Sequence, residues 1–276
     1  MLLTTPAVKS LKQRFPHARI TMVVKEWAFE AIKDNSHIDN VIIFNPSWTI
    51  ASQEGTKIAG LSGICKLVLR LRKERFDLAI DFKGDFRNIL IAYLSGAQRR
   101  ISYAVRGGGF LLTDIVPYEA GIHEIDKNLK LLTPLGIHSE DSHMELFING
   151  EDKTMVEQIF AQEGIDVNRK TIALHYGGAS RHKRWDTRKF IILAERLTAS
   201  NFTNVLIFGG HYERKASQLV RKPENGIFIM PNMTICQLAA AFRKCDLLVC
   251  NDSGPMHIGL AVGTPTVAIF GPTFAD

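Results

Sequence analysis

Residues 247–273 read LLVCNDSGPMHIGLAVGTPTVAIFGPT, which is a strand, turn, helix, turn and strand with its polar residues confined to the turns. The apolar run 247–250 is typical of a strand buried on both faces of a parallel sheet, and residues 251–255 break it and start a helix. A second strand follows at 266–270. This unit predicts an α/β fold with function in the loops 251–255 and 271–273, because open α/β sheets bind ligands at the carboxyl ends of their strands.

The turn after the first of these strands has the composition of an anion site. Pro255 suits a first helical turn, Asp252 or Ser253 can cap the helix, and Gly254 lets backbone N–H groups approach a ligand. His257 follows in the first turn or so and is expected to point back toward the same edge. The alternative is that Asp252 and Ser253 only cap the helix and that His257 is a half-buried histidine. The gathering of Asp, Ser, Gly and His at one strand end favours a ligand site.

The length and composition are those of a globular chain long enough for two domains: it has 276 residues, of which 46% are hydrophobic and 22% charged. The sequence has no apolar run of about 18 residues and no secretory leader, which predicts a cytoplasmic protein. A net charge of +6 favours an anionic partner such as a nucleotide, a phosphorylated glycan or a membrane surface, and nothing in the pattern favours nucleic acid. Four cysteines without a CxxC pair are expected to be small buried residues: Cys65, Cys236, Cys245 and Cys250.

Strand and helix patterns alternate along the chain, which predicts parallel sheets. Asn149-Gly150 marks the expected boundary between an N-terminal domain, 1–150, and a C-terminal domain, 151–276. In the first domain we expect strands at 20–24, 41–44, 77–81, 101–104 and 144–148, and helices at 7–14, 27–33, 64–75, 88–94 and 123–135. In the second we expect strands at 171–175, 204–208, 227–230, 247–250 and 266–270, and helices at 153–163, 187–198, 213–220, 235–242 and 255–262.

The loop 176–186, YGGASRHKRWD, follows the strand 171–175 at another carboxyl edge. Its glycines allow close approach, and Arg181, Lys183 and Arg184 can form a diphosphate clamp that neutralises a leaving group's developing charge. A solvated basic loop is the alternative for any one of these cations. Together with the 251–257 segment, the clamp is favoured.

A third strand end reads FGGHYE, residues 208–213, and the Glu213 carboxylate can accept hydrogen bonds from ribose hydroxyls. Glu213 also suits a helix dipole with no ligand present. The sequence has no P-loop, no HExxH, no GxSxG and no Asp-x-Asp pair for a metal-bound diphosphate. A metal-independent mechanism without a cofactor is therefore expected.

Several stretches together resemble the ADP-heptose:lipopolysaccharide heptosyltransferases, glycosyltransferase family nine. These are NDSGPMHIGLAVGTPTVAIFGPT, GGASRHKRW, FGGHYER, DLAIDFKG and LLTTPAVKSLKQRFPHARITMVV. The resemblance spans nearly the whole chain. It implies a GT-B fold, in which two Rossmann-like domains bind the acceptor mainly on the N-terminal side and the nucleotide sugar on the C-terminal side.

The resemblance also implies roles for individual residues. Lys183 would bind donor phosphate or sugar, Glu213 the ribose and Asp252 the heptose hydroxyls. Ser253, Gly254 and His257 would line the diphosphate region, Met233 would border the adenine, and Ser180 belongs to the same nucleotide-sugar set. On the acceptor side, the matching positions are His123 and Lys83, although family members more often carry Gln where this chain has Lys83.

Family members begin with a strand and a Gly-Asp turn whose aspartate is the proposed general base, so that base is expected to lie before Met1. The chain also stops before the family's last helices and is expected to be truncated at both ends. The function implied is inverting transfer of heptose from ADP-heptose to the lipopolysaccharide inner core, by a protein peripherally bound at the anionic inner membrane. A nucleotide-sugar-binding remnant without catalysis and a GT-B nucleotide-sugar epimerase are the alternatives.

Overall fold

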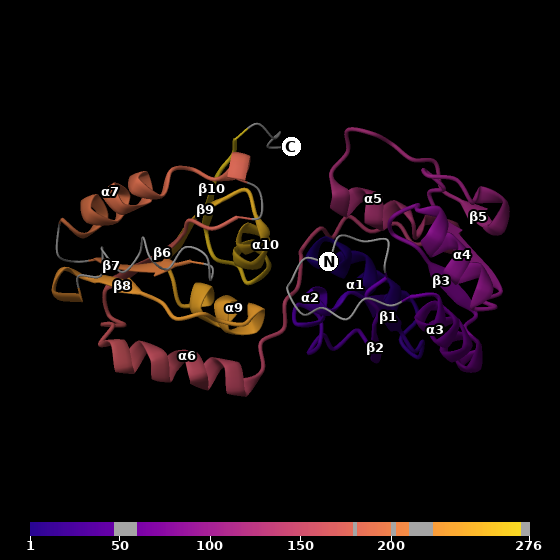
Figure 1. The fold of residues 1–276 in the computed structure, drawn as a ribbon, viewed down its shortest axis with the longest axis horizontal. Helices are drawn as coiled ribbons and strands as arrows, with labels where there is room; N and C mark the ends of the chain where they lie inside the picture. Colours follow the sequence, from indigo (N-terminus) through magenta and orange to yellow (C-terminus); the bar gives the residue numbers. More distant parts are fainter. Residues whose placement is uncertain (47–59, 179–180, 200–202, 210–222, 272–276) are drawn as a thin grey trace. The chain divides into compact units, whose positions relative to one another are not determined.

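The computed structural model describes residues 1–46, 60–178, 181–199, 203–209 and 223–271 (Figure 1). The chain forms two compact units, built from residues 3–144 and 145–276. The boundary inferred from the sequence, at residue 150, falls at the first residue of helix α6 (Gly150–Glu163), which belongs to the second unit.

The first unit contains two small parallel sheets among its described residues. One pairs β1 (Thr21–Val24) with β2 (Asn40–Ile43), and the other has the order β3 (Leu78–Ile80), β4 (Arg99–Ser102), β5 (Asp114–Ile115). The helices of this unit are α1 (Thr5–Arg14), α2 (Glu26–Phe29), α3 (Leu61–Glu74), α4 (Phe86–Leu94) and α5 (Glu124–Lys130), with single 3-10 turns η1 (Leu2–Thr4), η2 (Gly109–Leu111) and η3 (Thr133–Leu135).

The second unit contains a five-stranded parallel sheet with the order β10-β9-β6-β7-β8. Its strands are β6 (Lys170–His175), β7 (Thr203–Phe208), β8 (Ile227–Ile229), β9 (Leu247–Asn251) and β10 (Thr266–Ile269); beside α6, its helices are α7 (Thr187–Thr198), α9 (Ile235–Arg243) and α10 (Gly254–Ala261), with 3-10 turns η4 (Arg181–Lys183) and η6 (Pro223–Asn225). Counted within the unit, the order from β8 to β10 is 3-2-1-4-5, which is the Rossmann order. The switch point lies between β6 and β9.

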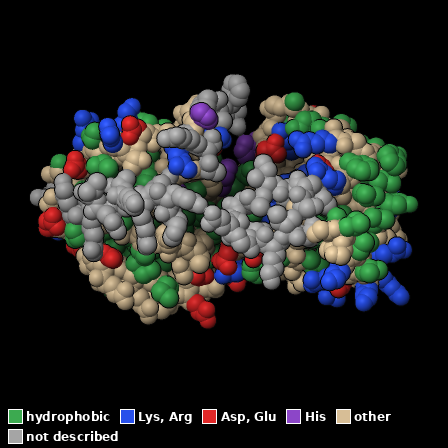
Figure 2. Space-filling model, in the orientation of Figure 1, with side chains coloured by type: hydrophobic (Ala, Val, Ile, Leu, Met, Phe, Trp, Pro, Cys, Tyr) green, Lys and Arg blue, Asp and Glu red, His purple; other side chains and the backbone are tan. Residues whose placement is uncertain are grey.

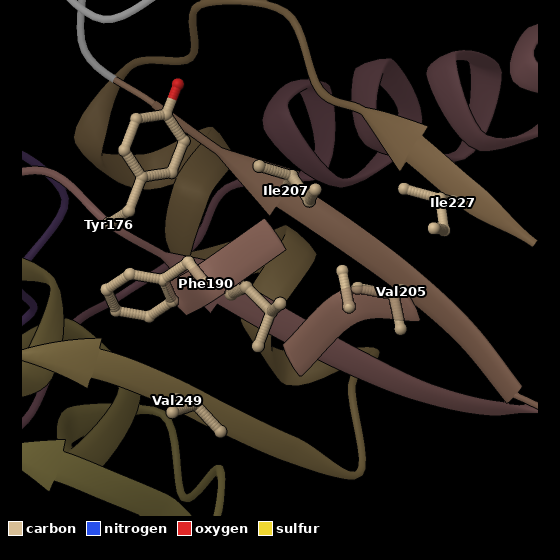
Figure 3. Close-up of a cluster of buried hydrophobic side chains, with 8 residues drawn as sticks. Tyr176, Phe190, Val205, Ile207, Ile227 and Val249 are labelled. Atoms are coloured by element: carbon tan, nitrogen blue, oxygen red, sulfur yellow. The ribbon is translucent and has the colours of Figure 1, made fainter. Parts of the chain in front are cut away.

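The sheet of the second unit carries helices on both faces, with α7 on one side and α9 on the other (Figure 1). On one face of the sheet, a cluster of buried side chains packs α7 against the strands. In this cluster, Tyr176 and Phe190 lie close to Val205, Ile207 and Val249 (Figure 3). Trp185 packs edge-on against Phe190, with ring centroids 5.0 Å apart. This packing fixes the start and end of the 176–186 loop against the sheet.

The predicted parallel α/β architecture is confirmed, because every strand pair among the described residues is parallel. Three local expectations were wrong. Residues 144–148 form no strand, the helix expected at 123–135 is divided into α5 and η3, and Cys65 is exposed on α3, while the other three cysteines are buried. The helix expected at 213–220 lies outside the described residues.

Helix α10 lies close to the sheet because Gly259 has no side chain. A Cβ at this position would be 2.5 Å from Cδ2 of Leu248, which is fully buried in β9, and 3.0 Å from Oγ1 of Thr266. We therefore expect Gly259→Ala to reduce the free energy of unfolding by about 1–3 kcal/mol through overpacking. Urea denaturation measures this change, with Gly254→Ala as the control, since a Cβ there meets no atom within 4 Å. Equal stability of the Gly259 variant would contradict the tight packing.

No helix in the described parts of the chain is both long and apolar enough to span a bilayer.

Candidate functional site

The candidate site lies at the Rossmann switch point of the second unit. Strands β6 and β9 are neighbours, with His175 opposite Cys250, so the loops that follow them begin side by side. At a switch point the two loops diverge to opposite faces of the sheet and leave room for a ligand between them. The sequence placed its two strongest motifs in these two loops, and the structure brings them together.

Asn251, which ends β9, ties the two loops to each other. Its side chain is fully buried, and its Nδ2 donates to the carbonyl oxygens of Tyr176 (2.9 Å) and Gly177 (3.3 Å). Its Oδ1 accepts from the backbone N–H of Trp185 at 2.9 Å. An amide is suited to this position because it donates and accepts at once. Sequence analysis gave Asn251 no role, although a polar residue directly after a buried apolar run was the available signal.

Lys183 and Asp252 form an ion pair across the two loops. Nζ of Lys183 lies 2.6 Å from Oδ2 of Asp252, and the two side chains are 35% and 14% exposed. The sequence analysis assigned both residues to one donor, and the structure places them in direct contact. A short, half-buried, charge-assisted hydrogen bond of this kind fixes the direction of both groups.

Ser253 makes no side-chain hydrogen bond to α10, so the structure does not support capping by this residue. Ser253 occupies the N-cap position, but its hydroxyl donates to the carbonyl of Asn251 at 3.2 Å and accepts no bond from the helix. The Asp252 carboxylate is directed to Lys183. Helix N-termini carry partial positive charge and attract anions, and Gly254 has no atom near its missing Cβ. His257 is half-buried in the first turn of the helix.

Close contacts at glycines show that further strand ends meet at this edge. A Cβ on Gly178 would lie 3.8 Å from Cβ of Ser253, and one on Gly271, after β10, would lie 2.9 Å from the carbonyl oxygen of His182. One on Gly209, after β7, would lie 2.3 Å from the Tyr176 hydroxyl. The described parts of the loops after β6, β9 and β10 thus approach one another near the Lys183–Asp252 pair.

Only some of the other residues predicted to bind the nucleotide sugar lie in the described parts of the structure. Nε of Arg184 donates to the carbonyl of Gly178 at 2.6 Å, so this cation also stabilises the conformation of its own loop. Met233 is half-buried after β8, directly before Thr234, which caps α9. Ser180 and Glu213 lie outside the described residues, so their assignments stay predictions.

Two titratable side chains beside the site are held neutral. Desolvation lowers the pKa of His175, at the end of β6, to about 4, and its Nδ1 is buried. Burial, with a smaller contribution from the charge of Asp252, raises the pKa of the Cys250 thiol to about 12. His175 therefore adds no positive charge near neutral pH, and Cys250 is no nucleophile. Sequence analysis missed His175 as a site neighbour.

In the first unit, Asp81 organises the turn that carries Lys83. Its carboxylate accepts from the backbone N–H groups of Lys83 (3.3 Å) and Gly84 (2.8 Å), and from the side chains of Asn88 (3.2 Å) and Ser102 (2.9 Å). Burial raises the pKa of Asp81, and these hydrogen bonds oppose the increase. Four donors occupy the carboxylate, which indicates a structural role.

Asp85 and His123 are likewise engaged. Arg87 holds the Asp85 carboxylate at 2.9 Å and 2.8 Å and, as the largest cause, lowers its pKa to about 2. Nδ1 of His123 accepts from the N–H of Ile125 at 3.2 Å at the start of α5. Because Nδ1 accepts this bond, Nε2 is the ring nitrogen of the exposed His123 that can donate to a ligand.

Lys25, at the end of β1, is a residue that the sequence analysis missed. Its pKa is lowered first by burial and then by the positive charge of Lys83, whose side chain is exposed after β3. The positive charges of Lys25 and Lys83, at the carboxyl ends of β1 and β3, therefore repel each other. An anion placed between them would relieve this repulsion. The expectation that the general base precedes Met1 stays a prediction.

Comparisons with known proteins point to one family. The model of glycosyltransferase family 9 (heptosyltransferase) matches residues 64–276. Lipopolysaccharide heptosyltransferase 3 of Escherichia coli is 25% identical over 99% of this chain and 80% of its own length. Lipooligosaccharide heptosyltransferase 2 of Campylobacter jejuni is 26% identical over 75% of this chain and 62% of its own length.

Solved structures agree on the fold. A glycosyltransferase family 9 protein of Veillonella parvula superposes with a TM-score of 0.85 at 24% identity, covering 99% of this chain and 78% of that one. Escherichia coli heptosyltransferase WaaC with ADP-2-deoxy-2-fluoro heptose gives a TM-score of 0.76 at 16% identity, covering 100% and 86%. The fold is thus that of the GT-B heptosyltransferases. Since the family model covers well over half of the residues, the chain belongs to glycosyltransferase family 9, the heptosyltransferases.

Proposed function

We propose that this heptosyltransferase moves a heptose from ADP-heptose to a hydroxyl of the lipopolysaccharide inner core, with inversion at the anomeric carbon. The relatives named above support this choice of donor and acceptor. The observation that carries the proposal is the Lys183–Asp252 pair beside the N-terminus of α10.

The geometry of the pair fits a nucleotide sugar better than a free nucleotide. Lys183 and the N-terminal turn of α10 supply positive charge for a diphosphate, whose negative charge increases as the sugar leaves. Asp252 supplies an acceptor for sugar hydroxyls. A ligand with a diphosphate and a sugar satisfies both members of the pair, whereas ADP alone must compete with Asp252 for Lys183.

On the acceptor side, Lys25 and Lys83 favour an anionic molecule, and the Nε2 proton of His123 is available to an oxygen of that molecule. The phosphorylated, acidic inner core has this chemistry, and its lipid anchor would keep the enzyme at the cytoplasmic face of the inner membrane.

Asp252→Asn tests the donor assignment. We expect ADP-heptose to bind roughly 10-fold more weakly or worse, because hydrogen bonds to charged groups contribute about 1.5–3 kcal/mol. ADP should bind equally well or more tightly, because the substitution removes a negative charge and releases Lys183. Titration calorimetry with the two ligands measures this divergence.

The matched control is Glu151→Gln, which removes one exposed carboxylate from the same unit away from the site loops. It should leave both affinities unchanged. Equal weakening of ADP and ADP-heptose by Asp252→Asn would refute the sugar assignment and leave Asp252 as a support for the loop.

Turnover separates the proposed function from the two alternatives. Release of ADP that depends on an inner-core acceptor supports the transferase. Binding of ADP-heptose without turnover would indicate a binding remnant, and a changed sugar nucleotide formed without acceptor would indicate an epimerase.

A further inference from the structure

The positive charge of the chain is concentrated in one segment of the first unit. Residues 61–111 contain ten Lys and Arg against four Asp and Glu, so this segment alone has a net charge of +6. The whole chain has the same net charge, and the other residues therefore balance to zero. The segment comprises α3, α4 and η2 with the strands β3 and β4 between them.

Helix α3 has an outer face that is both apolar and basic. Its inner residues Leu67 and Leu71 are buried, whereas Leu61 and Leu69 are 78% and 60% exposed. Leu61, Cys65 and Leu69 are four residues apart and share the outer face, which also carries exposed basic side chains. These are Lys66, Arg70, Arg72 and Lys73.

The turn η2 presents an aromatic side chain to the outside. Phe110 is 83% exposed, although its backbone is held in place. Nε of Arg100 donates to the carbonyl of Leu111 at 2.7 Å, and Gly108, with φ +87°, allows the turn to pack against Phe86 of α4. Arg106, two residues before Gly108, has a side chain that is 75% exposed.

Figure 2 shows hydrophobic side chains gathered at the end of this unit where Figure 1 draws α4 and β5, with Lys and Arg side chains along the border near α3. Exposed residues of α4 and β5 add to this area: Phe86, Tyr93 and Ile115. Contiguous exposed apolar side chains mark interaction surfaces.

We propose that the surface formed by α3, α4 and η2 makes the membrane contact, an inference that rests on the proposed function, and that it docks on an anionic phospholipid bilayer. A bilayer offers an apolar interior to Leu61, Leu69 and Phe110, and anionic headgroups to the surrounding cations. A second copy of the chain would place the same positive segment opposite this one and be repelled. A nucleic acid would pair with the cations but leave the exposed leucines without an apolar partner.

Sedimentation with vesicles tests the surface. Vesicles of phosphatidylethanolamine and phosphatidylglycerol should bind the chain, less so as salt is raised, and phosphatidylcholine vesicles should bind it weakly. Lys66→Glu with Arg70→Glu should lower the partition coefficient by roughly 25-fold or more, since each cation near the surface contributes about fivefold. Phe110→Ser should lower it by about 10-fold, the effect of leaving one large apolar side chain in water.

Matched controls lie on the second unit. Lys153→Glu with Arg243→Glu changes the net charge by the same amount at exposed positions, and Val167→Ser replaces a side chain that is 73% exposed. Equal losses from the control and the α3 double variant would overturn the proposal in favour of net charge alone. Failure of the chain to bind anionic vesicles, or dissociation of a dimer by Phe110→Ser, would overturn it as well. ADP affinity, measured for every variant, keeps this outcome separate from failure of the proposed function.

Discussion

Replacing Lys183 with alanine is expected to weaken ADP-heptose binding by roughly 10- to 150-fold, because charge-assisted hydrogen bonds contribute about 1.5–3 kcal/mol. Lys183 pairs with Asp252, which lies two residues before the start of α10, where we propose that the diphosphate is held. Titration calorimetry of the variant with ADP and ADP-heptose measures the effect. Lys153→Ala, which removes an exposed cation from helix α6 of the same unit, should leave binding unchanged.

The single variant also leaves Asp252 without its lysine, so the double variant Lys183→Ala, Asp252→Asn completes the experiment. If Lys183 contacts the diphosphate, ADP stays weakly bound when both are replaced. Recovery of ADP affinity in the double variant would mean that Lys183 acts only by neutralising Asp252.

Asn251→Asp is expected to destabilise the second unit by about 3–5 kcal/mol, because it buries an unpaired charge. The new carboxylate would face the carbonyl oxygens of Tyr176 and Gly177, where the native amide donates two hydrogen bonds. Burial raises the pKa of such a carboxyl in the folded state, so the loss should shrink as the pH falls and the group becomes protonated. Denaturant unfolding at several pH values measures both effects.

Asn204→Asp is the matched control for this substitution. Asn204 is also buried, and its Nδ2 donates to the carbonyl of Asp166 at 2.7 Å, at the start of β7 rather than at the site. Both variants should be destabilised, but only Asn251→Asp should weaken ADP binding in the folded protein. Comparable ADP affinity in the two would show that Asn251 does not hold the site loops.

Much of the fold was predictable because most apolar runs in this sequence are bounded by residues that end strands and helices, such as glycine and proline. The run at 247–250 and the proline and glycines around it locate β9 and α10 to within a residue or so. One failure was a strand-like pattern that has no neighbouring strand among the described residues. Residues 144–148 have a strand composition, yet a strand also needs a neighbour to accept its hydrogen bonds.

The site was predictable at the level of loops and not of individual contacts. The motifs located Lys183 and Asp252, but 69 residues separate them, and nothing in the sequence states that they pair. Asn251 was overlooked because a single polar residue after an apolar run does not reveal which distant backbone groups its amide will bond. Lys25 was overlooked because the charge of Lys83 acts on it only after β1 and β3 have both formed.

The bonds of Asn251 have a consequence for the order in which the protein folds. They join β9 to loop residues 66 to 75 positions earlier in the chain, so they close only after β6 and β9 have paired. Contacts of such sequence separation are slow to form, because the intervening chain must first lose its freedom. We therefore expect the site to be completed late in folding, so that the transition state offers ADP little to bind. ADP should therefore slow unfolding while leaving the refolding rate unchanged.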